Sequence, residues 1–405
     1  MSNLGDEQRF EGYERATAGL PAPLAVVDLD AFDANAEALV QRSLGVPIRV
    51  ATKSVRCRAL IDRALRRPGF AGLLAFSLPE ALWLAGGSTG PAAASLPDSV
   101  AEILVAYPCL DRAALRALAG DADARSRIAL VIDAPEHLAL IEAVARESDA
   151  EGPVQVWLDV DASLRVGPAH LGARRSPLHA VDDVVAAARA VAGSPHTRLG
   201  ALMCYDAQIA GLADTGLAVH LMQRVSTAEL ARRRARIVEA VRAVTPVPAV
   251  NAGGTGSLHL MGRAPEVSEL AAGSGLFGPT LFDGYRAFQP RPAACFALDV
   301  VRHPAPGFVT AFSGGYCASG QAGPSRLPTP CWPPGLDLLS TEGAGEVQTP
   351  LRVTSGRAPA IGSRVWLRHA KAGELLERFA QVSLVRGDEV VEAVPSYRGE
   401  GMCFG

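Results

Sequence analysis

The segment Ile48-Arg49-Val50-Ala51-Thr52-Lys53-Ser54 joins a short apolar run to a lysine. Such a run predicts a buried β-strand, and Lys53 falls where this strand should end. Lysines are few in the chain and arginines are many, so arginine is the usual surface cation. A half-buried lysine amine loses its proton readily and attacks carbonyl groups; the alternative is a surface lysine whose stem covers apolar residues. Lys53 is therefore a candidate reactive residue.

The alternation of strand-like and helix-like segments predicts the architecture. Short β-branched runs alternate with Ala-, Leu- and Arg-rich stretches of helical period, for example at 181–191 and 227–244. Eight such βα units predict a closed (β/α)₈ barrel of the TIM type. The expected strands lie at 48–52, 72–76, 103–106, 128–132, 154–160, 199–203, 248–251 and 267–271.

The two ends of the chain differ from this pattern. An apolar run at 24–29, before a helical pattern at 31–42, lies outside the eight units and is a candidate to pair with a second domain. After Tyr285 glycine and proline become frequent, helical periodicity almost disappears, and the Pro/Gly-rich stretch 319–335 predicts a long loop. Strand-like runs follow at 295–301, 309–312, 364–368, 382–386 and 390–393. We therefore expect an N-terminal extension at 1–23, a barrel domain at 24–285 and a C-terminal β domain at 286–405.

Composition narrows the classes of function. The chain has 405 residues, 49% of them hydrophobic, and a net charge of −3, which gives no electrostatic footprint for nucleic acid or for an anionic membrane. No apolar run approaches the roughly 20 residues of a membrane-spanning helix. The first 15 residues are too polar for a signal peptide, and the seven scattered cysteines suggest neither a disulfide framework nor a zinc site. A cytoplasmic location fits these features.

Polar residues follow the expected barrel strands, at the end where such barrels carry out chemistry. They are Lys53, Tyr107, Asp133, Asp159, Asp161, Arg165, Tyr205, Asp206 and Gln208. Glycine-rich loops follow the last two strands, Asn251-Ala-Gly-Gly-Thr-Gly-Ser257 and Ala272-Gly-Ser-Gly275. Loops at these strands often bind phosphate on backbone N–H groups, although an ordinary tight turn is the alternative for Gly-Gly-Thr-Gly. A lysine on the first strand and a phosphate loop opposite suit pyridoxal phosphate.

The segments Leu24-Ala-Val-Val-Asp-Leu-Asp-Ala-Phe-Asp-Ala-Asn35 and Arg49-Val-Ala-Thr-Lys-Ser54 carry a family resemblance. The chain resembles, over most of its length, the alanine-racemase-like, fold-type III pyridoxal phosphate enzymes, and among them the D-threonine aldolase and D-serine dehydratase branch. The resemblance implies that Lys53 forms the Schiff base and that the protein is a homodimer whose subunits share each active site. It also implies a cofactor site formed by Arg165, Tyr205, Asn251, Gly253, Gly254, Thr255, Gly273, Ser274 and Gly275.

The sequence departs from this branch at its metal ligands. The branch carries a His-x-Asp or His-x-Cys pair late in the β domain, whereas the matching stretch here is His369-Ala-Lys371. An ammonium group cannot ligate a divalent cation, so Lys371 is a candidate to supply positive charge in place of the metal, and His369 becomes a candidate base. The alternatives are that Lys371 pairs with Glu374 on a surface turn, that His369 is a core residue, or that His369 binds a divalent metal with Glu374 or Glu346.

These features favour an aldolase that cleaves β-hydroxy-α-amino acids to glycine and an aldehyde, and the resemblance implies that its substrates are D-configured, such as D-threonine. Its catalytic residues are expected to be Lys53, His369 and Lys371. A D-serine or D-threonine dehydratase is the main alternative, and a bound metal would favour it. A racemase would need a tyrosine from the β domain placed opposite the lysine as a second base. Tyr316 and Tyr397 are the tyrosines of that domain. A non-catalytic carrier of pyridoxal phosphate would not need the β domain.

Overall fold

A computed structural model describes residues 3–86, 102–213, 216–247 and 249–405. The chain forms two compact units, and both are assembled from separate stretches of sequence. One unit contains the barrel and comprises Leu39–Lys53, Asp62–Gly273 and Phe404–Gly405. The other contains a large β-sheet and comprises Met1–Ala38, Ser54–Ile61 and Ser274–Cys403.

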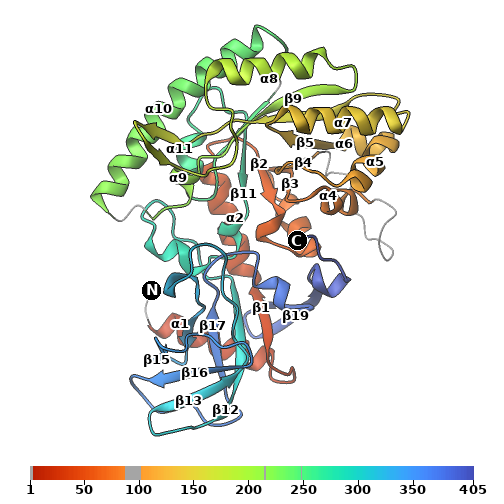
Figure 1. The fold of residues 1–405 in the computed structure, drawn as a ribbon. Coiled ribbons are helices and arrows are strands. Elements are labelled where there is room, and N and C mark those ends of the chain that lie inside the picture. Colours follow the sequence, from red (N-terminus) through yellow and green to blue (C-terminus); the bar gives the residue numbers. More distant parts are fainter. Residues whose placement is uncertain (1–2, 87–101, 214–215, 248) are drawn as a thin grey trace. The chain divides into compact units, whose positions relative to one another are not determined.

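The barrel unit contains the predicted closed barrel of parallel strands (Figure 1). Its strands are β2 (Ile48–Ala51), β3 (Phe70–Ala75), β4 (Ile103–Val105), β5 (Ile128–Ile132), β6 (Val154–Asp159), β9 (Thr197–Cys204), β10 (Ala249–Ala252) and β11 (Glu269–Ala272). The barrel closes where Leu270 of β11 pairs with Ile48 of β2. Each strand overlaps one of the eight expected ranges, which confirms the barrel prediction; Pro248 lies outside the described residues.

Helices follow most of these strands; the helix at Val181–Gly193, α8, packs on β6 and β9 and on the neighbouring helices α7 and α10 (Figure 1). The longest, α10, begins ten residues before the expected range 227–244. The helices are α1 (Asn3–Ala16), α2 (Leu29–Arg42), α3 (Arg58–Leu65), α4 (Leu78–Leu84), α5 (Arg112–Gly120), α6 (Ala122–Arg127), α7 (Pro135–Glu147), α8 (Val181–Gly193), α9 (Ala207–Ala210), α10 (Leu217–Arg242) and α11 (Leu258–Met261). None of the helices in this described part is long and apolar enough to cross a membrane.

The barrel core combines apolar side chains with the buried cation of Arg49. Arg49 is 3% exposed, and its guanidinium bonds to Glu102 and Glu269 at 2.7 Å each and lies over the Trp157 ring. These partners compensate the cost of burying the charge. Gly200 makes room for this layer, because a Cβ there would lie 2.6 Å from the Trp157 indole nitrogen.

The second unit is built on a sheet of nine strands, counted in the described residues. They are β1 (Leu24–Asp28), β12 (Ala294–Arg302), β13 (Phe308–Phe312), β14 (Thr329–Trp332), β15 (Leu336–Leu338), β16 (Gln348–Val353), β17 (Arg364–Arg368), β18 (Gln381–Arg386) and β19 (Glu389–Pro395). Strand β1 pairs with both β12 and β18, so the early apolar run joins the second sheet. The two compact units therefore differ from the expected division into a barrel domain at 24–285 and a β domain at 286–405. Strand β1 belongs to the sheet unit, because its apolar side chains are buried in the sheet.

Several elements were not expected from the sequence, among them α1, β15 and β16, and two further ones have identifiable reasons. The Pro/Gly-rich stretch 319–335 contains β14, which pairs only with β17 among the described strands and carries Pro330. Proline lacks an N–H donor but is tolerated in such an edge position. Because the segment is rich in proline and glycine, its sequence is typical of a loop even though part of it forms a strand. The second element is a hairpin after β6, formed by β7 (Leu164–Val166) and β8 (Ala169–Leu171).

Candidate active site

Lys53 lies at the carboxyl end of β2, in a short 3₁₀ turn formed by Thr52–Ser54. The buried Thr52 hydroxyl donates to the Leu74 carbonyl and fixes this turn to the neighbouring strand. The Lys53 side chain is half-buried, and its Nζ lies 2.7 Å from the hydroxyl of Tyr107, the second residue after β4. The structure thus brings the candidate nucleophile into hydrogen-bond contact with an ionisable phenol.

Arg175 completes this arrangement from the loop after β8. Its guanidinium carbon lies 5.5 Å from the ring centroid of Tyr107 and 5.4 Å from that of Tyr205. Burial alone would raise the pKa of Tyr107, but the charges and hydrogen bonds of Lys53 and Arg175 outweigh it and lower the pKa. Burial raises the pKa of Tyr205 to about 12. The two tyrosines therefore share one arginine but differ in acidity.

Arg165, which the sequence suggested beside the cofactor, has another partner in the structure. Its guanidinium pairs with Asp161 at 2.7 Å on the β7–β8 hairpin, and its side chain is exposed. Asp161 also accepts hydrogen bonds from the backbone N–H and the hydroxyl of Ser163. Sequence reasoning missed Arg175, because the hairpin that turns the chain back could not be predicted. The adjacent Arg174-Arg175 pair was the available signal.

Two carboxyl groups lie at the ends of the next strands. Burial is the main cause that raises the pKa of Asp159 to about 7; Asp133 also raises it, while Arg175 acts in the opposite direction. Asp133 also has a raised pKa from burial, and its carboxylate lies 3.2 Å from Nδ1 of His137. Asp133 borders an apolar cavity of about 620 Å³ beside α7 and α8. These acids make this side of the barrel mouth able to hold or exchange protons.

The glycine-rich loop after β10 is fixed from beneath by Arg42. This arginine donates to the carbonyls of Thr255 at 2.7 Å and of Gly256 at 3.3 Å. Gly253 has a φ of +79°, and a Cβ on Gly254 would lie 3.2 Å from the Tyr205 ring. With two carbonyls held by Arg42, the loop keeps a defined shape that brings its backbone close to Tyr205.

A buried acid lies under the same loop. Burial raises the pKa of Asp206 to about 6, although the Ser257 hydroxyl and the Gly253 backbone act in the opposite direction. Asn251, expected in the phosphate site, instead donates from its side-chain amide to Glu269 at 2.8 Å inside the barrel. Gly273, Ser274 and Gly275 directly follow β11, and Ser274–Leu276 forms a 3₁₀ turn.

These features fit pyridoxal phosphate. A half-buried lysine amine, aromatic rings and two glycine-rich loops stand at the carboxyl ends of the barrel strands. Close approach of the backbone at Gly253 and Gly254 suits an anion bound on N–H groups. Lys53 would hold the aldehyde carbon, Tyr205 and Arg175 would flank the ring, and the loops at Gly253–Thr255 and Gly273–Gly275 would hold the phosphate.

His369 and Lys371 belong to the sheet unit, just after β17. His369 is 2% exposed, and burial, with the charge of Arg368, lowers its pKa to about 3. Lys371 Nζ lies 3.3 Å from the Ser319 hydroxyl, and Glu374 accepts from the Ser319 backbone N–H at 2.8 Å. Glu346 is exposed in a different loop. Among residues 3–86, 102–213, 216–247 and 249–405, no group of three or more His, Cys, Asp and Glu side chains could hold a metal.

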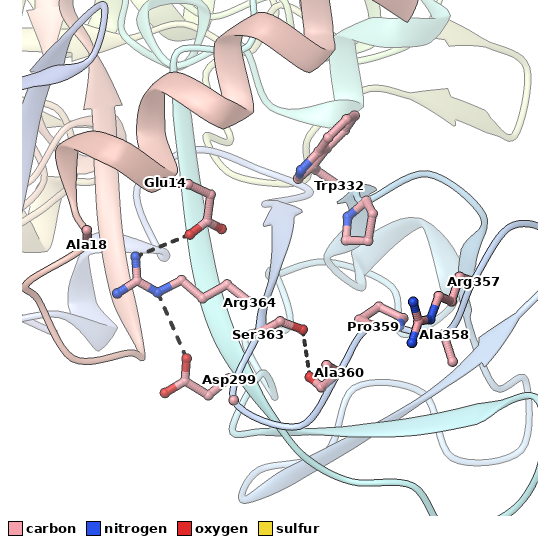
Figure 2. Close-up of a pocket in the computed structure, with 12 residues that line it drawn as sticks. Glu14, Ala18, Asp299, Trp332, Arg357, Ala358, Pro359, Ala360, Ser363 and Arg364 are labelled. Carbon is pink, nitrogen blue, oxygen red and sulfur yellow. Dashed lines mark hydrogen bonds and ion pairs between the residues drawn. The ribbon is translucent and has the colours of Figure 1, made fainter.

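A separate cavity of about 840 Å³ lies in the sheet unit (Figure 2). Its central cation, Arg364, approaches Glu14 at 3.6 Å and Asp299 at 3.9 Å, and it donates to the Thr17 and Leu20 carbonyls. These protein groups already occupy the Arg364 guanidinium, while Arg357 lines the same cavity.

The comparisons with known proteins identify the family of the chain. The family model for the alanine racemase N-terminal domain matches residues 27–280. The chain therefore belongs to the alanine-racemase-like, fold-type III family of pyridoxal phosphate enzymes, as the sequence suggested. No curated protein matches the chain.

Several solved structures share the fold at low sequence identity. D-threonine aldolase from Filomicrobium marinum is 20% identical with a TM-score of 0.78, covering 95% of this chain and 96% of that one. D-threo-3-hydroxyaspartate dehydratase from Delftia sp. HT23 is 22% identical with a TM-score of 0.71, covering 94% and 98%. Alanine racemase from Clostridium difficile 630 is 12% identical with a TM-score of 0.60, covering 93% and 99%.

Proposed function

We propose that this protein is a pyridoxal phosphate-dependent aldolase that cleaves D-β-hydroxy-α-amino acids to glycine and an aldehyde. The observation that carries the proposal is the half-buried Lys53 amine at the end of the first barrel strand, at the same barrel end as the glycine-rich loops after β10 and β11. The fold likeness to D-threonine aldolase supports the reaction class. Pyridoxal phosphate, when bound, supplies an electron sink for the bond that breaks at Cα.

The residues of the chain have distinct roles in this proposal. Lys53 would hold the cofactor through its amine. The backbone N–H groups of the two glycine-rich loops hold the phosphate, and Arg42 keeps the first loop in shape. Arg175 and Tyr205 flank the ring, so Arg175 takes the place that the sequence assigned to Arg165.

His369 is the proposed base for the substrate β-hydroxyl. A pKa lowered to about 3 keeps its imidazole neutral and able to accept a proton, although the same burial weakens it as a base. Lys371 is proposed to supply positive charge where related enzymes carry a metal ligand, because its ammonium group cannot ligate a cation. Its contact with Ser319 fixes the position of this charge.

A D-hydroxyamino acid dehydratase is the second candidate. The fold similarity to D-threo-3-hydroxyaspartate dehydratase, with a TM-score of 0.71, is nearly as high as that to D-threonine aldolase, at 0.78. This similarity supports the dehydratase as a candidate. In this reaction Lys53 would remove the Cα proton, and loss of the β-hydroxyl would lead to an oxo acid and ammonia.

Product analysis separates the two. The protein is loaded with pyridoxal phosphate, treated with a chelator and incubated with D-threonine, with Lys53→Ala as the control for cofactor-independent background. Glycine and acetaldehyde formed without added metal are expected from the aldolase. If 2-oxobutanoate and ammonia form instead, the dehydratase is the correct assignment. If activity returns only with a divalent ion, the role given to Lys371 is wrong.

A further inference from the structure

The contact between Lys53 and Tyr107 has a chemical meaning beyond holding a side chain in place. An ordinary lysine amine is protonated at neutral pH, and an ammonium group has no electron pair with which to attack an aldehyde. The lysine therefore needs a base within hydrogen-bond reach. The Tyr107 hydroxyl, 2.7 Å from Lys53 Nζ, is in this position.

The surroundings of Tyr107 favour its phenolate form. Lys53 and Arg175 place two positive charges beside the phenol, and these lower its pKa despite its burial. Arg175 lies over the ring at 5.5 Å from the centroid, so it both stabilises the phenolate and fixes the ring. A nucleophile, a base and a third group that orients the base form the pattern by which enzymes activate a side chain.

The tyrosine on the other side of Arg175 provides a contrast. Arg175 lies at a similar distance, 5.4 Å, from the Tyr205 ring centroid, but burial raises the pKa of Tyr205 to about 12, and its phenol stays protonated near neutral pH. The two tyrosines thus share the arginine, whereas Lys53 is a further cation that lowers the pKa of Tyr107. Of these two tyrosines, Tyr107 is the one whose hydroxyl lies within hydrogen-bond distance of Lys53.

We propose that Tyr107 is the general base that deprotonates Lys53, and that Arg175 is the positioning residue that orients the Tyr107 ring and stabilises its phenolate form. The inference rests on the proposed role of Lys53 in binding the cofactor. A proton passes from the Lys53 ammonium to the phenolate oxygen, and the N–H electron pair stays on Nζ. The free amine attacks an aldehyde carbon, and the phenol returns the proton to the carbonyl oxygen, which becomes a hydroxyl. The phenolate then takes a second proton from the attacking nitrogen and passes it to this hydroxyl, which leaves as water while the nitrogen electron pair forms the C=N bond.

The chain offers a direct test, because Lys53 and Lys371 are its only two lysines. Cofactor-free protein is methylated with formaldehyde and a borane reductant across a pH series, and the rate at each lysine is followed by peptide mass spectrometry. Lys371 serves as the internal reference and as a check of folding. We expect Tyr107→Phe to lower the rate at Lys53, relative to Lys371, by about tenfold or more near neutral pH and to move its pH profile upward.

Two further variants define the mechanism. Arg175→Lys keeps a positive charge without the planar guanidinium and is expected to give an intermediate rate at Lys53. Tyr316→Phe removes the hydroxyl of a tyrosine in the sheet unit, where it bonds to Ser313, and is expected to leave the Lys53 rate and its pH profile unchanged. An ultraviolet titration of the cofactor-free protein should show one tyrosine ionising below the usual range, and Tyr107→Phe should abolish it.

The outcomes are distinct from those of the aldolase test. An unchanged Lys53 rate and pH profile in Tyr107→Phe would overturn the inference, and so would the absence of an early-ionising tyrosine. A reactive Lys53 that depends on Tyr107, in a loaded protein that makes no glycine from D-threonine, would support the inference while contradicting the aldolase assignment.

Discussion

The imidazole of His369 lies edge-on to the ring of Phe277, with centroids 6.2 Å apart and planes inclined at 78°. An apolar neighbour of this kind cannot compensate a charge on the imidazole. Burial and the nearby Arg368 guanidinium accordingly lower the pKa of His369 to about 3. This relationship ties a candidate catalytic residue to the stability of the sheet unit.

The stability of the protein should therefore depend on pH through His369. Its pKa is lower in the folded than in the unfolded chain, so its neutral form contributes fully above about pH 6.5 and the contribution is lost as pH falls toward 3. The slope contributed within this window approaches about 1.4 kcal/mol per pH unit. Urea unfolding of wild type and His369→Gln at several pH values should show a difference that shrinks on acidification. His220→Gln, at an exposed position, is the matched control; a constant difference would mean that His369 is not buried in its neutral form.

Arg42 should control affinity for the phosphate group through the glycine-rich loop. Arg42→Ala removes hydrogen bonds to the Thr255 and Gly256 carbonyls, and bonds from a charged donor contribute about 1.5–3 kcal/mol. We expect pyridoxal phosphate to bind about tenfold more weakly or worse, while pyridoxal, which lacks the phosphate, changes little. Equilibrium titration of both compounds checks this, with the exposed Arg236→Ala as control. If pyridoxal phosphate and pyridoxal lose affinity equally, Arg42 does not act through the loop that binds the phosphate.

The barrel could be predicted from sequence because its signals are local. Each strand is a short apolar run, and the closed barrel brings the residues after these runs to one end, so Lys53, Tyr107 and Tyr205 were recognisable as candidates before the structure. The early run at β1 was also recognised as a candidate partner of the second sheet, which its pairing with β12 and β18 confirms. Each βα unit shows the same alternation of a strand-like and a helix-like pattern, so the evidence for the barrel recurs along the chain.

The remaining features depend on contacts between residues distant in sequence. Arg165 and Arg175 follow the same strand, and only the β7–β8 hairpin decides which of them lies against Tyr107 and Tyr205. Asn251 looked like part of a phosphate loop, but β10 continues to Ala252 and leaves its amide bonded to Glu269 in the barrel. The periodicity of the sequence does not indicate which partner such a side chain contacts.

The beginning of α10 is a candidate subunit interface. Leu217, Leu221 and Val225 are 92%, 63% and 47% exposed and, at intervals of four residues, lie on one face of the helix. An exposed apolar stripe of this kind favours association, and we propose that the protein is a homodimer. The double variant Leu217→Ser/Leu221→Ser should halve the mass measured by light scattering without lowering the melting temperature. Leu44→Ser, at an isolated exposed position, should stay dimeric; a wild-type mass of one chain would refute the proposal.

Covalent labelling should identify the lysine that binds the cofactor. Because the chain has only Lys53 and Lys371, borohydride reduction of the protein loaded with pyridoxal phosphate can mark only these two side chains or the amino terminus. Lys53 lies at the barrel mouth with a hydrogen-bonded phenol, whereas Lys371 contacts Ser319 in the sheet unit, so we expect the adduct on the Lys53 peptide. Lys53→Ala should lose both this adduct and the visible absorbance of the Schiff base, and Lys371→Arg should retain them. An adduct that persists in Lys53→Ala, or that maps to Lys371, would move the reactive amine to the sheet unit and overturn the assignment on which the aldolase proposal depends.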